Sequence, residues 1–333
     1  MPKHLPVKTE SRAIVPLASI IERARAYGEA AKAPNTRRAY ASDWQHFASW
    51  CQDHGLPPLP AMPGTIAAYL TAHAESLKVS TLGRRLAAIR AAHAYASKAL
   101  DLNGQAFRDV WAGIRRERGS RPVKKRALVT ADLRSAISAS PNSLIGKRDR
   151  ALLLIGFASA LRRSELASLT VGHVTFTDNG LIIELGRSKS DQEGQGAIVG
   201  VPFGSRVLTC PVRALRAWLD TAGITNGPVF RRVSRHGLAG SEAITGHGIA
   251  LAIKQAVRRA ALADGHDEAT AAAMVATVGG HSLRAGFVTA ADAAGAPISK
   301  IMEQARHARF ETTRGYIREA DAFRDNAASY LGL

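Results

Sequence analysis

The sequence predicts a mainly α-helical protein with a small antiparallel β-sheet, in which an N-terminal helical bundle precedes a mixed α/β domain. Two observations lead to this prediction. Residues 17–118 place apolar side chains at helical spacing and show few signs of strands. Farther along, two runs rich in β-branched residues, 174–177 and 181–185, flank Asp178-Asn179-Gly180, and an Asn-Gly pair between such runs is typical of a hairpin. With 333 residues, the chain has room for two domains, each with a sizeable core.

The first domain, 17–118, is expected to hold five helices, because Pro, Ser and Asn mark helix starts and Gly marks a helix end. After a flexible N-terminal arm at 1–16, the expected helices are 17–31, a second that Asn35 caps and Gly55 ends, a third that Pro63 opens and that runs over 66–74, a fourth that Ser80 caps, and 105–116. The side chains expected on the buried face of the fourth helix are Leu82, Leu86, Ile89, His93 and Tyr95. Together these helices predict a small bundle.

A basic linker at 119–127 is expected to separate the two domains. Between Arg115 and Arg126, seven residues are Lys or Arg and one, Glu117, is acidic, with a Gly and a Pro among them. Such a charge run is either a solvated connector or a segment that lies along a polyanion.

The second domain, 128–333, is expected to be mixed. Thr130 is expected to cap a helix, 147–161 to form a long apolar helix, and 197–203 to add a third strand to the hairpin. Further helices are expected at 211–222, 245–263, 268–278, 281–294, 298–305 and 321–330. The last segment either packs on its own domain or docks into a neighbouring copy.

The net charge of +18 and the sequence pI near 10.6 point to a polyanionic partner, because a positive field concentrates phosphate near the surface. The excess is spread along the chain. Residues 1–120 carry 17 Lys and Arg against 9 Asp and Glu, and residues 121–333 carry 28 against 18. A basic tail would concentrate the charge at one end, whereas this distribution predicts that both domains touch the same polymer. The alternative is a basic solvated surface, as in many ribosomal proteins.

The two cysteines, Cys51 and Cys210, lie far apart and belong to no CxxC pair, which argues against a disulfide framework and against a thiolate zinc site. Residues 1–15 lack the apolar core of a signal peptide, and the longest apolar run, 151–155, is too short to cross a bilayer. We therefore expect a cytoplasmic protein without a membrane partner.

Six side chains form a set that suits chemistry on a phosphodiester, namely Arg162, Lys189, His281, Arg284, His307 and Tyr316. An HxxR pair or a lone Tyr is weak by itself, so the prediction depends on the combination and its order. Guanidinium groups donate two parallel hydrogen bonds to phosphate oxygens and stay charged at working pH. Tyr316 is the candidate nucleophile, Lys189 the candidate general acid for a departing oxygen, and Glu165 is placed to orient Arg162.

The chain resembles the tyrosine recombinases of the phage integrase family, in the compact two-domain form of the Xer and Cre proteins. Residues 160–166 are similar to the arginine box of the family, and 186–189 resemble its β-hairpin lysine segment. Residues 281–284 match the HxLR box, and His307 precedes Tyr316 by nine residues, the family spacing. The chain departs from the family pattern at Ala285 and at Ala305-Arg306, positions that are not catalytic in the family.

The resemblance implies a helical core-binding domain and a catalytic domain that clamp duplex DNA. It implies a 3′-phosphotyrosyl intermediate at Tyr316, strand exchange through a Holliday junction, and a tetramer on two DNA sites that is a monomer or weak dimer when free. It also implies association with the nucleoid and no cofactor or metal, and the sequence shows no HExxH, Walker loop or carboxylate cluster. The trio His266-Asp267-Glu268 is better explained as a helix start than as a metal site. The rival functions are a type IB topoisomerase and a catalytically silent DNA-binding relative.

DNA contacts are expected from basic residues on the fourth helix, the linker, the hairpin and the 245–263 helix. The candidates are Arg84, Arg85, Arg90, Arg121, Lys124, Lys125, Arg187, Lys254, Arg258 and Arg259.

Overall fold

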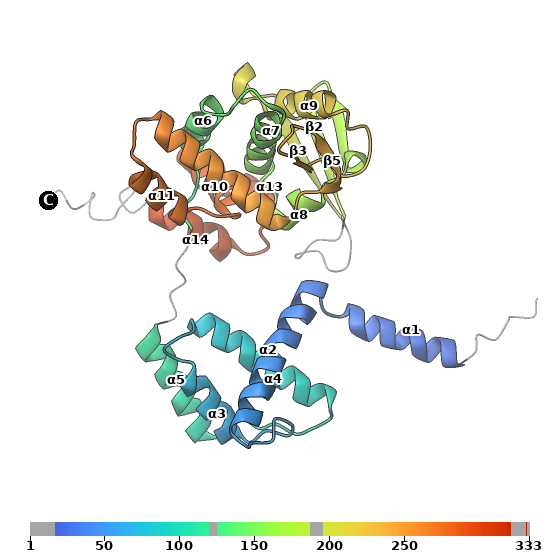
Figure 1. Ribbon diagram of the computed structural model, residues 1–333, viewed down its shortest axis with the longest axis vertical. Helices are drawn as coiled ribbons and strands as arrows, with labels where there is room; N and C mark the ends of the chain where they lie inside the picture. Colours follow the sequence, from blue (N-terminus) through green and yellow to red (C-terminus); the bar gives the residue numbers. More distant parts are fainter. Residues whose placement is uncertain (1–16, 120–124, 187–195, 321–330, 332–333) are drawn as a thin grey trace, which may run out of the picture. The chain divides into compact units, whose positions relative to one another are not determined.

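The computed structural model describes residues 17–119, 125–186, 196–320 and 331, and it divides into two compact units, Met1–Val123 and Lys124–Leu333 (Figure 1). The arm at 1–16 and the whole 321–330 helix expected from the sequence thus lie outside the described residues. None of the helices in the described ranges is long and apolar enough to cross a membrane.

The described elements of the first unit are all helices, with α2 packed against α4 and α3 against α5. Its helices are α1 (Leu17–Ala30), α2 (Pro34–Asp53), α3 (Pro63–Ala72), α4 (Val79–Tyr95) and α5 (Gln105–Arg118). The core contains fully buried side chains from α2, α3 and α4, among them Phe47, Ile66, Tyr69, Leu82 and Ile89. The predicted bundle is therefore present, and its helix ranges agree closely with the expected ones.

Two predicted caps in this unit are wrong. Asn35 and Ser80 lie inside their helices, because α2 begins at Pro34 and α4 at Val79. A proline suits the first helical position, since its fixed φ matches the helix and its missing N–H would have no partner there.

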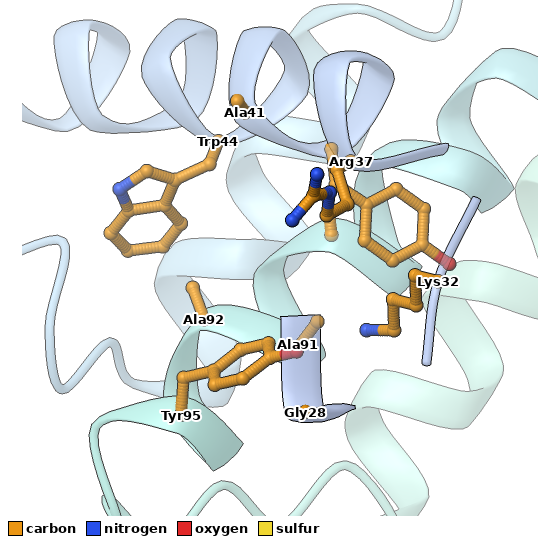
Figure 2. A pocket seen from close by; sticks show the side chains of 10 residues that line it. Gly28, Lys32, Arg37, Ala41, Trp44, Ala91, Ala92 and Tyr95 are labelled. Carbon is orange, nitrogen blue, oxygen red and sulfur yellow. The ribbon is translucent and has the colours of Figure 1, made fainter. Parts of the chain in front are cut away.

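Tyr95 was expected on the buried face of α4, but it is 74% exposed. Leu82, Leu86, Ile89 and His93 follow one another by three or four residues and are buried, whereas Tyr95 comes two residues after His93 and so faces another direction. Its ring instead lines a hollow with Lys32 and Trp44 (Figure 2). The Lys32 Nζ lies 5.3 Å from the centre of the Tyr95 ring, within the range of a cation–π contact.

The second unit combines two small antiparallel sheets with helices. Its elements are α6 (Thr130–Ser138), α7 (Leu144–Ala158), α8 (Arg163–Ser168), β1 (Val174–Thr177), β2 (Gly180–Leu185), β3 (Ala197–Pro202), α9 (Pro211–Ala222), β4 (Arg231–Val233), β5 (Ala239–Ala243), α10 (Gly246–Ala263), α11 (Glu268–Thr277), α12 (Ser282–Ala293), α13 (Ile298–Ala305) and α14 (Phe310–Ala320). The apolar helix α7 packs against α9 and α12 and lies at the centre of the core. Asp267 caps α11 by accepting the Thr270 N–H at 2.8 Å, which confirms that His266-Asp267-Glu268 is a helix start.

The predicted hairpin and third strand are present as the antiparallel sheet β1-β2-β3. Thr177 pairs with Gly180, so Asp178 and Asn179 form the turn. Gly180 has φ 146°, and a Cβ there would lie 2.2 Å from the carbonyl oxygen of Val201, so only glycine lets β3 approach this closely. The smaller β4-β5 hairpin was not predicted, because its strands are short and lack β-branched runs.

A small separate core holds the last helices of the described chain together. Ala160, Val288, Ile301 and Ile317 are buried in it, and Tyr316 packs against it from α14. This cluster joins the turn after α7 to α12, α13 and α14. The segments that carry Arg162, Arg284, His307 and Tyr316 are thus fixed to one another by apolar packing.

Candidate active site

Arg162 and Glu165 form a tightly bonded pair at the start of α8. Arg162 is the extended residue before the helix, and Glu165 lies in the first turn. The Glu165 carboxylate accepts the Arg162 backbone N–H at 2.8 Å through Oε2 and the Arg162 Nη1 at 2.7 Å through Oε1. The first contact satisfies a helix-terminal N–H, as in a capping box, and the second fixes the guanidinium.

Arg284 is 4% exposed on α12 and reaches the same turn, where its Nη1 donates to the carbonyl of Ala160 at 2.7 Å. Ala160 has φ 49°, an unusual conformation for a residue with a Cβ, and it lies two residues before Arg162. Arg284 and Arg162 are therefore anchored on one short turn. Burial first, and then the charges of Arg162 and Arg306, lower the pKa of Arg284 to about 10, so it stays protonated at neutral pH.

The α12 helix is held in place by close packing on the chain that precedes α6. A Cβ at Gly286 would lie 1.8 Å from the carbonyl oxygen of Leu128, which leaves no room for a side chain. His281 is the exposed residue at the N-cap of α12, three residues before Arg284. Gly280 before it packs against Arg163, since a Cβ would lie 2.3 Å from the Arg163 Cδ. The neighbouring arginines thus separate, with Arg162 bound to Glu165 and Arg163 lying along Gly280.

His307 and Tyr316 face each other between the end of α13 and α14. Their rings are nearly parallel, with 5.9 Å between centroids and 9° between planes. The His307 Nδ1 is 2.8 Å from the Thr313 hydroxyl, and Thr313 and Tyr316 share one face of α14. Burial first, and then the charges of Arg284, Arg162 and Arg306, lower the pKa of His307 to about 4, so the imidazole is neutral at neutral pH.

Arg306 occupies a position that is not catalytic in the family, but its side chain lies inside this site. Its Nη2 donates to the Glu165 Oε2 at 2.6 Å, and its side chain is 11% exposed. No motif in the sequence signalled this contact, because it joins residues 141 positions apart. These contacts also affect the pKa of Glu165. Burial alone would raise this pKa, but the charge of Arg306 and the contacts with the backbone N–H and side chain of Arg162 hold it below the usual value.

The structure therefore brings together Arg162, Arg284, His307 and Tyr316. Glu165 bonds Arg162, and Arg306 bonds Glu165. Lys189 lies outside the described residues, as do Arg187, Arg121 and Lys124. Between β2 and β3, the chain is described only at Gly186 and Gly196.

The remaining basic candidates differ in their surroundings. Arg84 binds Asp43 through two hydrogen bonds, at 2.6 and 3.0 Å, and the Arg85 Nη1 donates to the Tyr69 hydroxyl at 2.9 Å. Arg258 is bonded to Glu268, Arg259 lies 3.4 Å from Asp149, and the Lys125 Nζ donates to the carbonyl of Ala276. Arg90 is exposed, and Lys254 is half-buried.

Two family models match this chain: the phage integrase family over residues 126–322, and the phage integrase N-terminal SAM-like domain over residues 27–99. An integrase/recombinase xerD homolog of Selenomonas ruminantium is 37% identical over 312 residues, which are 91% of this chain and 87% of the relative. The recombinase cre of Escherichia phage P1 is 25% identical and covers 86% of this chain and 85% of its own length.

Solved structures share the fold at low sequence identity. The XerH site-specific recombinase, in a post-cleavage complex with a palindromic difH substrate, aligns with a TM-score of 0.59 at 17% identity, over 82% of this chain and 73% of its own. The Tn1549 transposon integrase bound to transposon right end DNA aligns with a TM-score of 0.58 at 16% identity, over 94% and 96% of the two chains.

Proposed function

This chain belongs to the phage integrase family of site-specific tyrosine recombinases, and we propose that it cuts and rejoins duplex DNA through a covalent bond between Tyr316 and a 3′-phosphate. The observation that supports this most directly is the placement of the Tyr316 ring beside His307, in a site that contains the buried Arg284 and the partly buried Arg162. A nucleophile and a set of phosphate-binding groups thus occupy one site.

In the proposed reaction, the scissile phosphate lies against Arg162 and Arg284, whose guanidinium groups stabilise the charge that grows on its non-bridging oxygens. The Tyr316 oxygen attacks phosphorus, its phenolic proton passes to solvent water, and the bond to the 5′-oxygen breaks. Lys189 is proposed to protonate the departing oxygen, while His281 and the neutral His307 donate to the phosphate.

The tyrosyl phosphate keeps the free energy of the broken bond, so that the free 5′-hydroxyl of a partner strand can attack it without a nucleotide. We propose two rounds of this exchange, through a Holliday junction, by four protomers on two DNA sites. The chain's net charge of +18, spread over both halves, supports binding along duplex DNA. Two of the proteins that share the fold were solved bound to DNA, XerH on difH and the Tn1549 integrase on a transposon end.

The test is covalent capture on nicked suicide duplexes, which trap the intermediate because the cut piece diffuses away. Wild type is expected to form a protein–DNA adduct in chelator and without ATP, and Tyr316→Phe to form none. If wild type and Tyr316→Phe behave alike, the chain is a silent DNA-binding relative. If wild type relaxes plasmids that lack any recombination site, a topoisomerase of type IB is the better description.

A further inference from the structure

We propose that Arg306 is a positioning residue of this site, which holds Glu165 and through it keeps the Arg162 guanidinium aimed toward the scissile phosphate. This inference rests on the proposed function, because it assigns Arg162 to the phosphate. It concerns a position to which the sequence motifs assign no catalytic role.

The contacts form a closed cluster of one carboxylate between two guanidinium groups. Glu165 Oε2 accepts both the Arg162 backbone N–H, at 2.8 Å, and the Arg306 Nη2, at 2.6 Å, while Oε1 accepts the Arg162 Nη1 at 2.7 Å. In return, the Arg162 Nη2 lies 3.5 Å from the Arg306 carbonyl oxygen. The side chains of Arg162, Glu165 and Arg306 are 17%, 8% and 11% exposed, so water screens these contacts little.

The net charge of the cluster depends on Arg306. A buried Arg162–Glu165 pair is neutral as a unit, and a neutral unit attracts a phosphodiester weakly. Arg306 supplies a second positive charge to the same carboxylate, so the trio keeps a net charge of +1 beside the charge of Arg284. Glu165 can then orient Arg162 without neutralising the site.

The backbone at Arg306 supports the same conclusion. Arg306 has φ 52° and ψ 51°, the left-handed conformation that ends α13 and that favours glycine. A long side chain at such a position strains the backbone, so its contact with Glu165 is expected to offset that strain. Gln304 holds the same segment by donating from Nε2 to the carbonyls of Ala158 and Gly200, which ties α13 to α7 and to the sheet.

The arrangement also affects His307, the next residue. Arg306 is one of three arginines whose charge, after burial, depresses the pKa of the imidazole. Removing Arg306 should therefore raise the pKa of His307 from about 4 toward its ordinary value near 6.5.

The experiment compares R306G, which suits the backbone, and R306K, which keeps a cation but loses the planar fork, with R309G at an exposed arginine as the matched control. The probe is a duplex that the wild type captures from a pool of nicked duplexes of randomised sequence. Single-turnover adduct formation at saturating DNA is expected to fall roughly 10- to 100-fold in R306G, and less in R306K. R309G is expected to keep the wild-type rate.

A double-mutant cycle tests the route through Glu165. If Arg306 acts through the carboxylate, R306G should cost little in an E165Q background, and the two losses should be far from additive. Full additivity, or a wild-type cleavage rate in R306G, overturns the proposal. R306K serves the same cycle if R306G is too unstable to purify.

Side-chain NMR of the free protein separates this proposal from the proposed function. Rotation of the Arg162 guanidinium, followed by ¹⁵N relaxation, is expected to be slow in wild type and faster in R306G. Unchanged rotation overturns the positioning role whatever the cleavage rate. If wild type captures no duplex and matches Tyr316→Phe, the proposed recombinase chemistry fails, and this NMR comparison still decides whether Arg306 positions Arg162.

Discussion

The imidazole of His307 and the phenol of Tyr316 lie nearly parallel, 5.9 Å apart at their centres, although the two residues belong to different segments. Thr313 explains the arrangement, because its hydroxyl contacts the His307 Nδ1 at 2.8 Å from the same helix that carries Tyr316. A contact at Nδ1 leaves the Nε2 of His307 for a substrate oxygen. Helix α14 thus both carries Tyr316, the proposed nucleophile, and sets the orientation of the His307 ring.

Thr313→Val should therefore slow strand cleavage without unfolding the protein. Valine keeps the shape of the fully buried threonine but cannot bond the imidazole. One such hydrogen bond contributes about 1 kcal/mol, which corresponds to a loss of about fivefold in the single-turnover rate. The control is Thr312→Val on the exposed side of α14. Equal rates for both variants would show that the Thr313 contact does not set the geometry of His307.

The low pKa of His307 predicts how stability depends on pH. The folded chain binds a proton at this imidazole only near pH 4, whereas the unfolded chain binds one near pH 6.5. Between these values the unfolded state holds more protons, so the free energy of unfolding falls as the pH drops from 6.5 to 4, and it is unaffected by this group above 6.5.

Urea unfolding at pH 7.5, 6.0 and 5.0 measures this effect. His307→Gln is expected to lose less stability than wild type over this range. Glu165, whose pKa lies below its ordinary value, acts in the same direction but only at lower pH, because its stabilising charge is lost below about pH 4.5. Parallel curves for wild type and His307→Gln would contradict the assignment.

Gly286→Ala should be strongly destabilising. Its Cβ would lie 1.8 Å from a backbone oxygen of Leu128, so α12 would have to move and carry Arg284 with it. Overpacking of this kind costs about 1–3 kcal/mol or more. Thermal unfolding measures it against Gly279→Ala, whose Cβ would meet the flexible Lys125 side chain, with Cγ at 3.4 Å as the nearest atom. A melting temperature for Gly286→Ala that matches Gly279→Ala would mean that α12 packs differently.

Local patterns were sufficient for much of the fold. The helices Pro211–Ala222 and Ile298–Ala305 have the expected bounds, and the Asp-Asn-Gly turn identified the hairpin. Helix α14 was not predicted, because Gly315 in its middle weakens the local preference, and the helix is held by the packing of Ile317 in the small core.

Part of the candidate site could likewise be predicted from the sequence, and part of it could not. Arg162, Arg284, His307 and Tyr316 could be named from their order and spacing, since family motifs record that chemistry. The contact between Arg306 and Glu165 could not be predicted, because it forms only when the fold brings the end of α13 to the first turn of α8. The same holds for the Thr313 contact with His307, which depends on an unpredicted helix.

The two arginines Arg84 and Arg90 on α4 should behave differently when each is replaced by alanine. Arg84 donates two hydrogen bonds to Asp43, a carboxylate that is 4% exposed. Without Arg84, Asp43 would keep Arg85 nearby, but at 3.8 Å from Nε that cation is too far for a hydrogen bond, so Arg84→Ala should lower the free energy of unfolding by about 1–3 kcal/mol.

Arg90→Ala should leave stability nearly unchanged, because this residue is exposed, and it should instead weaken DNA binding. Loss of one phosphate contact lowers the salt dependence of the binding constant by about one counterion, with little change in sequence preference. Fluorescence anisotropy with a labelled duplex, repeated over a series of salt concentrations, measures that slope, and urea unfolding measures stability. Arg84 becomes the better DNA contact if its alanine variant alone changes the slope, because the Asp43 pair would then open when DNA binds.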